Sequence, residues 1–248
     1  QFLRPLGYRC YHAGKWHLMG APRPLADGGF DHSYVVHDHD RFFNPKNHEL
    51  DDRKLDPVRE GSGFYVTTAI ADRAMEFLQE HAREHENTPF YCYLAFTSPH
   101  FPLHALQEDI TRHRDRYAAG WDCVRRQRWE RLRNMGMVNC DPAPLEADVI
   151  PGWNFPKEKL TEMIGPGEVG RAVAWMDLTE DQKRFQATKM AIHAAMVDRM
   201  DREIGRVLDQ IRNMGVFDDT LTMCLSRDGT RNISGLSLAF RTNGATTF

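Results

Sequence analysis

The stretch TTAIADRAMEFLQEHAREH (residues 67–85), followed by PFYCYLAF (89–96), decides the fold that this sequence predicts. Its first part places residues three and four apart on one helical face: Ile70, Ala74, Phe77, Leu78 and His81. Thr67 or Thr68 is expected to be the N-cap of this helix. The second part is a continuous apolar run rich in aromatic residues, which predicts a buried strand ending at the polar loop TSPHFPL (97–103).

The same order recurs later in the chain. A stripe at i, i+3 and i+4 predicts a long helix through residues 197–211 that ends at Gly215, a residue suited to the C′ position. The run TLTMCL (220–225) then predicts a second strand, which stops at SRDGT. Helix followed by buried strand, twice, predicts an α/β fold with helices on the faces of the sheet. Residues 139–179, rich in Pro, Gly and Trp, are expected to form long loops or a small insertion.

The segment GYRCYHAGKWHL (7–18) is the first candidate site, because it combines a buried-strand pattern with charged residues. If residues 14–17 are extended, Lys15 and His17 point to one side and Trp16 to the other. A fixed positive charge beside an imidazole, with an aromatic anchor behind it, suits an anion. The alternative is an edge strand with a snorkelling lysine and a surface histidine. Ligands gather beyond the carboxyl ends of strands in α/β sheets, so we expect this segment and both polar loops at one rim.

Two further candidates follow the predicted strands. His100 lies between Pro99 and Phe101-Pro102, and the prolines stiffen the loop that directs its imidazole. The alternative is a structural histidine in a proline-rich turn. Asp228, in SRDG, follows Arg227 at the end of a strand and could bind a divalent cation through oxygen. The alternative there is an ordinary Asp-Gly turn.

Two charged runs allow weaker interpretations. HDHD (37–40) resembles a metal-binding run, although mixed His/Asp runs in loops are usually solvated. Five arginines follow GWD on an expected helix and could form a phosphate or sulfate patch: Arg125, Arg128 and Arg131, which would share one face, and Arg126 and Arg133. A solvated or salt-bridged helix is the alternative for these arginines.

Composition excludes several classes of protein. The 248 residues are 41% hydrophobic and 27% charged, enough apolar material for one large or two modest domains. The net charge of -3 argues against a nucleic-acid partner, and no apolar run approaches membrane-spanning length. Five scattered cysteines without a C-x-x-C pair argue against a disulfide framework and a structural zinc site.

In series, these segments resemble the type I sulfatase family of the alkaline-phosphatase-like superfamily. The likeness runs from residue 7 to about 229 and is carried by motifs in the family's order: GYRCYHAGKWHL, GFD (29–31), YLAFTSPHFPLHA (93–105), GWDCVRRQRWERL (120–132) and MVDRMDREIGRVL…LTMCLSRDG (196–229). The resemblance implies a large mixed sheet sandwiched by helices, and hydrolysis of sulfate esters of sugars or aryl compounds. It makes residues 1–232 a partial catalytic domain and 233–248 a divergent or truncated tail.

The resemblance also implies roles for single residues. Lys15 falls on the lysine that holds the sulfate, His17 on a histidine near the nucleophile, and His100 on the histidine credited with the sulfate or the leaving group. Such groups stabilise charge on the transferred group and protonate the departing oxygen. The family uses a formylglycine nucleophile and a calcium ion, and its members are often exported to the periplasm or outside the cell.

Departures from the family pattern lower the expected activity. The C/S-x-P-x-R motif that yields formylglycine does not occur in the chain, and the usual S-D-N-G reads Ser226-Arg227-Asp228-Gly229. Arg227 would repel calcium, leaving Asp228 as a weak ligand. We therefore expect an inactive fragment of a sulfatase. The alternatives are a phosphodiesterase or phosphonate hydrolase of the same superfamily, and a non-catalytic protein that binds sulfated glycans.

Overall fold

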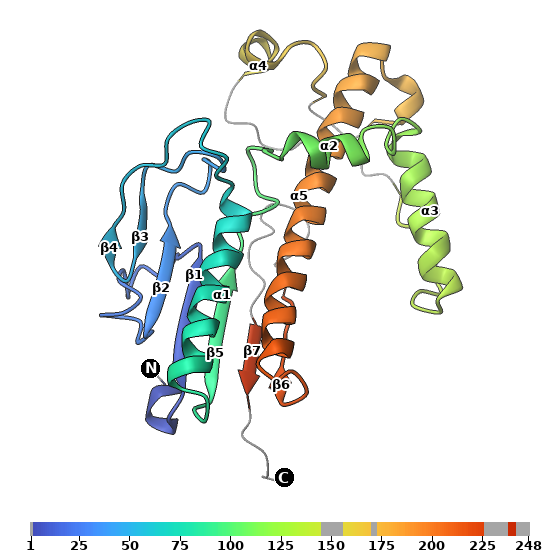
Figure 1. The fold of residues 1–248 in the computed structure, drawn as a ribbon. Coiled ribbons are helices and arrows are strands. Elements are labelled where there is room, and N and C mark those ends of the chain that lie inside the picture. The colour runs from blue at the N-terminus through green and yellow to red at the C-terminus, as the bar shows by residue number, and fades with distance from the viewer. Residues whose placement is uncertain (1, 145–155, 170–172, 226–237, 242–248) are drawn as a thin grey trace. The chain divides into compact units, whose positions relative to one another are not determined.

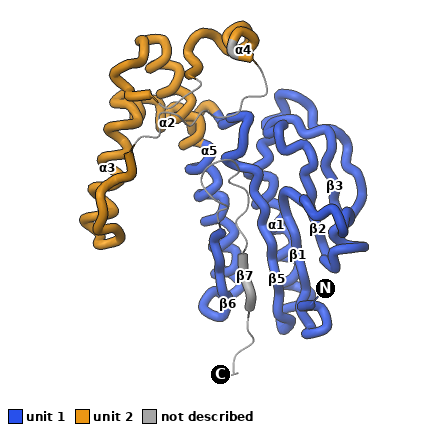
Figure 2. Tube along the Cα trace, turned by 180° about the vertical axis from the view of Figure 1, so that it is seen from behind, with its two compact units in different colours: residues 1–106, 196–248 blue, residues 107–195 orange. Residues whose placement is uncertain are grey.

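The structure is a computed structural model that describes residues 2–144, 156–169, 173–225 and 238–241. The chain forms two compact units (Figure 2): unit 1 comprises residues 1–106 and 196–248, and unit 2 comprises residues 107–195. Among the described helices, none is long and apolar enough to cross a membrane.

Unit 1 is built on a mixed sheet, whose described strands follow the order β4-β3-β2-β1-β5-β7-β6 (Figure 1). These strands are β1 (Arg9–Gly14), β2 (His32–Val36), β3 (His48–Leu50), β4 (Arg53–Lys54), β5 (Phe90–Ala95), β6 (Thr220–Leu221) and β7 (Leu238–Arg241). The unit also contains the 3-10 turn η1 (Arg4–Leu6), helix α1 (Val66–Glu84) and the second half of α5 (Glu180–Asn213). The mixed α/β fold expected from the sequence is confirmed.

Unit 2 is helical in its described part. It contains α2 (Gln107–His113), α3 (Gly120–Asn134), α4 (Lys157–Ile164), the 3-10 turn η2 (Trp175–Asp177) and the first half of α5. The arginine-rich run lies on α3, as its pattern predicts. Residues 139–179, expected as loops or an insertion, include α4 and η2.

The centre of the sheet is parallel, which decides where the loops lie. Strand β1 pairs in parallel with β2 on one side and β5 on the other, and Gly14 is opposite both Val35 and Ala95. The three strands therefore end at the same edge of the sheet. The loops that follow β1 and β5 share one rim, as the sequence predicted.

Helix α1 covers one face of this sheet. Its five predicted core residues are all buried, and the ring of Phe77 stacks on Tyr11 of β1 with centroids 6.1 Å apart. The predicted threonine N-cap is wrong: the helix begins at Val66 after Tyr65, with no side-chain cap. Both hydroxyls make tertiary hydrogen bonds instead, Thr67 with Ser98 at 2.6 Å and Thr68 with Glu203 at 3.0 Å.

Helix α5 ends as predicted, but the strand after it is shorter than predicted. Gly215 has a φ of +71°, its N–H donates to Arg212, and the N–H of Val216 donates to Ile211, the pattern of a Schellman motif. Of TLTMCL only Thr220–Leu221 is a strand, at the edge of the sheet and antiparallel to β7. Leu221 is 56% exposed, so the prediction of a fully buried strand is wrong. An apolar run alone does not show whether a neighbouring strand covers it.

We expect Gly14→Ala to destabilise unit 1 by on the order of 3 kcal/mol. Gly14 has a φ of +126°, and a Cβ there would lie 2.0 Å from the carbonyl oxygen of Ala95. Urea unfolding followed by circular dichroism measures the loss. Gly205→Ala is the control, because a Cβ inside α5 meets nothing within 4 Å and should stabilise the helix by up to about 1 kcal/mol. Equal stability of Gly14→Ala and the unsubstituted chain would contradict the close approach.

Candidate active site at the rim of the parallel strands

The end of β1 places Lys15 at the rim. The strand stops at Gly14, and the N–H of Lys15 donates to the carbonyl oxygen of Ala95 at 2.8 Å. The strand assigned in the structure ends at Gly14, whose φ is +126°, so it does not include Lys15, Trp16 or His17. Lys15 is half-buried and His17 is exposed.

Trp16 anchors this segment on the face of the sheet opposite α1. Its Nε1 donates to the carbonyl of Ala21 at 2.7 Å. Its ring meets His12 edge-on at 5.0 Å and Phe30 at 5.6 Å. The backbone that carries Lys15 is thus fixed from both sides, by Ala95 and by the aromatic contacts of Trp16.

Lys15 supplies a positive charge that no described residue neutralises. Its side chain makes no ion pair or hydrogen bond within the described part of the chain. Burial lowers the pKa of its ammonium group, because water solvates the charged form less well there. An ammonium group that is partly desolvated and unpaired gains more from a bound anion than a fully hydrated one.

His12 is a buried residue of this region that sequence reasoning did not single out. Its Nδ1 is 2.9 Å from the hydroxyl of Ser33, and its Nε2 is 3.4 Å from the carbonyl oxygen of Lys15. A carbonyl only accepts, so Nε2 donates and Nδ1 accepts from Ser33. Burial lowers the pKa of His12 to about 4. His12 is therefore a neutral structural residue that holds β2 and the Lys15 backbone together.

The loop after β5 brings His100 to the same rim. The backbone N–H of His100 donates to the carbonyl of Thr97 at 3.0 Å, and its Nδ1 bonds the carbonyl oxygen of Phe101. Because this carbonyl accepts, Nδ1 carries the proton in the neutral ring, and Nε2 is left for a ligand. The buried hydroxyl of Thr97 has no partner among the described residues. A hydroxyl left in this way costs about 1–3 kcal/mol, so the rim has unused hydrogen-bonding capacity.

The loop after β2 brings HDHD to this rim as well. The carboxylate of Asp38 accepts from the backbone N–H groups of Lys46 at 2.7 Å and Asn47 at 3.0 Å. The ring of His39 lies edge-on to that of His100, with centroids 5.8 Å apart. Asp38 therefore braces the loop. The metal interpretation of HDHD finds no support, since the described residues contain no group of three or more potential ligands.

Two groups of predicted residues remain, one in the SRDG motif and one on α3. Arg227 and Asp228 lie outside the described residues. Within unit 2, Arg125 bonds the carbonyl of Ala143, and the Arg133 guanidinium lies 5.2 Å above the Trp129 ring. Among the described residues, no three or more His, Cys, Asp or Glu side chains gather into a group that could hold a metal ion.

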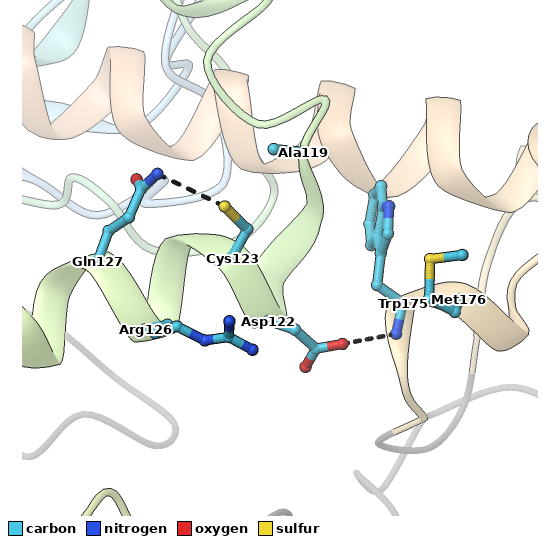
Figure 3. A pocket seen from close by; sticks show the side chains of 7 residues that line it. All are labelled: Ala119, Asp122, Cys123, Arg126, Gln127, Trp175 and Met176. Atoms are coloured by element: carbon cyan, nitrogen blue, oxygen red, sulfur yellow. Dashed lines mark hydrogen bonds between the residues drawn. The ribbon is translucent and has the colours of Figure 1, made fainter.

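A separate hollow of about 390 Å³ lies within unit 2 (Figure 3). It lies between the first turns of α3 and η2 and is lined by Ala119, Asp122, Cys123, Arg126, Gln127, Trp175 and Met176. The Asp122 carboxylate accepts from the backbone N–H of Trp175 at 2.9 Å, which joins its two walls. Of the arginine-rich run on α3, Arg126 lines it.

Comparison with known proteins links the chain to one family. The sequence model described as "Sulfatase" matches residues 1–228. An "uncharacterized sulfatase" of Schizosaccharomyces pombe is 29% identical over 246 residues, covering 92% of this chain and 40% of that protein. An arylsulfatase of Klebsiella aerogenes is 30% identical over 241 residues, covering 92% and 46%. This chain therefore spans less than half the length of these relatives.

One solved structure supports the fold. The sulfatase-like protein yidJ from Bacteroides fragilis superposes with a TM-score of 0.51 at 14% identity, covering 96% of this chain and 47% of that one.

We expect His12 to make the folded chain less stable as the pH falls from 7 towards 4. The unfolded chain takes up a proton on this ring near pH 6.5 and the folded chain only near 4, so in that window protons favour unfolding. The loss is on the order of 3 kcal/mol. Urea unfolding at pH 7 and pH 4.5 measures it.

His12→Gln should flatten this pH dependence, whereas His17→Gln, an exposed histidine of the same segment, should leave it unchanged. NMR titration of the His12 ring gives the same answer without a substitution, since its midpoint should lie near pH 4. A midpoint near 6.5 would show that the ring is not desolvated.

Proposed function

Because its match over residues 1–228 makes this chain a member of the sulfatase family, we propose that it carries the sulfate-handling part of a sulfuric ester hydrolase. The observation that supports this most is the close approach of the loops after β1 and β5. Lys15 and His100, the two residues that the resemblance assigns to sulfate, both lie in these loops, and the bond from the Lys15 N–H ties the start of the first loop to Ala95, the last residue of β5.

Lys15 is suited to bind the sulfate group. The backbone that carries it is held in place at Gly14 and Trp16, and no described carboxylate forms an ion pair with its ammonium group. In a half-buried position the attraction between an ammonium group and an anion is stronger than in bulk water. The ammonium group would stabilise the negative charge of the sulfate group while it is transferred.

His100 is suited to handle a proton at the ester oxygen. Its Nδ1 bonds the Phe101 carbonyl, so Nε2 is the ring nitrogen left to contact a ligand. The neutral ring, with its proton on Nδ1, can only accept at Nε2, whereas the ring protonated at both nitrogens can donate a proton from Nε2 to a departing alkoxide. His17 is exposed two residues after Lys15, so the loop after β1 offers a second imidazole besides that of His100.

Calcium and formylglycine belong to the family expectation and carry no step of this proposal. Asp228, the expected calcium ligand, lies outside the described residues, and the C/S-x-P-x-R motif is absent from the chain. The residues of this chain therefore supply binding and proton transfer, whereas the attack on sulfur needs a nucleophile that this sequence does not encode.

We expect the chain to bind inorganic sulfate and Lys15→Ala to weaken that binding by about 10-fold to 100-fold, the worth of a hydrogen bond to a charged group. Isothermal titration calorimetry measures both affinities. Lys54→Ala is the control, because Lys54 is exposed on β4, an outermost strand of the sheet that is separated from β1 by β3 and β2. Equal weakening by both variants would reduce the effect to net charge. Stronger binding of inorganic phosphate than of sulfate would favour the phosphodiesterase alternative.

The chain by itself is expected not to hydrolyse 4-nitrophenyl sulfate, since it lacks the motif that yields the nucleophile. Release of 4-nitrophenol by the purified chain, followed at 400 nm over hours, tests this. Turnover above the buffer rate that disappears in Lys15→Ala would show that another residue of this chain attacks the sulfur.

A further inference from the structure

His39 is a histidine at the rim to which neither the family resemblance nor the comparisons give a role. It follows β2 by three residues, and His100 follows β5 by five. In the sheet, β1 lies between these two strands. The contact between the two rings therefore spans the carboxyl end of β1, where Lys15 emerges.

The loop that carries His39 is rigid, because its own residues brace it. Asp38 accepts two backbone N–H groups from Lys46 and Asn47, and the N–H of His37 donates to the carbonyl of Asn47 at 3.0 Å. Further along, the ring of Phe42 is buried edge-on against His104, with centroids 5.8 Å apart. His104 belongs to the loop of His100, so the two loops are packed together beyond the histidine pair.

The protonation of His39 follows from its backbone contact. Its Nδ1 lies 3.1 Å from the carbonyl oxygen of His37 and must donate to it. In the neutral ring Nε2 is then an acceptor, and no described residue bonds it. An acceptor of this kind suits a hydroxyl group.

Exposure orders the groups at the rim from inside to outside. Lys15 and His100 are half-buried, whereas His39 is exposed. A sulfate ester bound with its charged end near Lys15 and its ester oxygen near His100 extends its alcohol part outwards. His39, whose ring centroid lies 5.8 Å from that of His100, offers a hydrogen-bonding atom on this outer side.

We propose that His39 determines substrate specificity by accepting a hydrogen bond, at Nε2, from a hydroxyl group of the alcohol part of a sulfated carbohydrate. This rests on the proposed function, since it takes the sulfate position from Lys15 and His100. His39 makes no contact with the sulfate itself, so its contribution appears only with a ligand that carries a hydroxyl beside the ester.

The test compares three probes on the full chain by isothermal titration calorimetry: inorganic sulfate, 4-nitrophenyl sulfate and glucose 6-sulfate. His39→Ala should weaken glucose 6-sulfate by about 5-fold to 10-fold, the worth of one hydrogen bond. It should change the affinity for the other two probes by less than about 2-fold. His39→Gln, which keeps an acceptor, should recover part of the loss.

His85→Ala is the matched control, because His85 follows α1 and precedes β5, at the opposite edge of the sheet. Thermal unfolding of His39→Ala should match the unsubstituted chain, since the side chain is exposed. Equal weakening of all three probes would make His39 a sulfate ligand and overturn the inference, as would no effect on glucose 6-sulfate. If the unsubstituted chain binds none of the probes, the proposed function fails, and this inference fails with it.

Discussion

The structure of the rim depends on one close approach, that of Gly14 to Ala95. Parallel pairing of β1 with β5 continues to the last residue of both strands, and only a glycine leaves room for the Ala95 carbonyl there. The hydrogen bond from Lys15 then continues the contact beyond the strands. Backbone contacts therefore position Lys15 and the His100 loop. Bringing these two segments together does not require long side chains to lose conformational freedom.

Much of unit 1 could be predicted from local periodicity, because its elements are buried on a regular pattern. Helix α1 and strand β5 were predicted from apolar spacing and continuity, and the structure confirms both. The sequence did not show that Thr67 and Thr68 make tertiary hydrogen bonds instead of capping the helix, because their partners Ser98 and Glu203 are distant in the chain. For the same reason TLTMCL was predicted to be too long, since burial of a strand depends on the neighbours it acquires.

The site was predictable where residues follow a strand end and much less where they lie within one. Lys15 and His100 stood out because each interrupts or follows an apolar run. His12 did not stand out, because a histidine inside an apolar run is expected to be an ordinary core residue. Its structural role is seen only from its hydrogen bonds to Ser33 and to the Lys15 carbonyl. His39 was grouped with a possible metal run, and its contact with His100 emerges only when β2 and β5 are placed on either side of β1.

The charges at the rim also bear on which ester fits it. In the described part of the chain the loops at the rim carry two half-buried cations, Lys15 and Arg41, while Asp38 and Asp40 add negative charge beside Arg41. His12 stays neutral because of its burial, so it does not add a further positive charge. A phosphate monoester carries close to two negative charges at pH 7, whereas a sulfate monoester carries one. Carboxylates on the neighbouring loop repel a second negative charge on a ligand more than a single one, and this repulsion supports our proposal that the rim takes a sulfate ester.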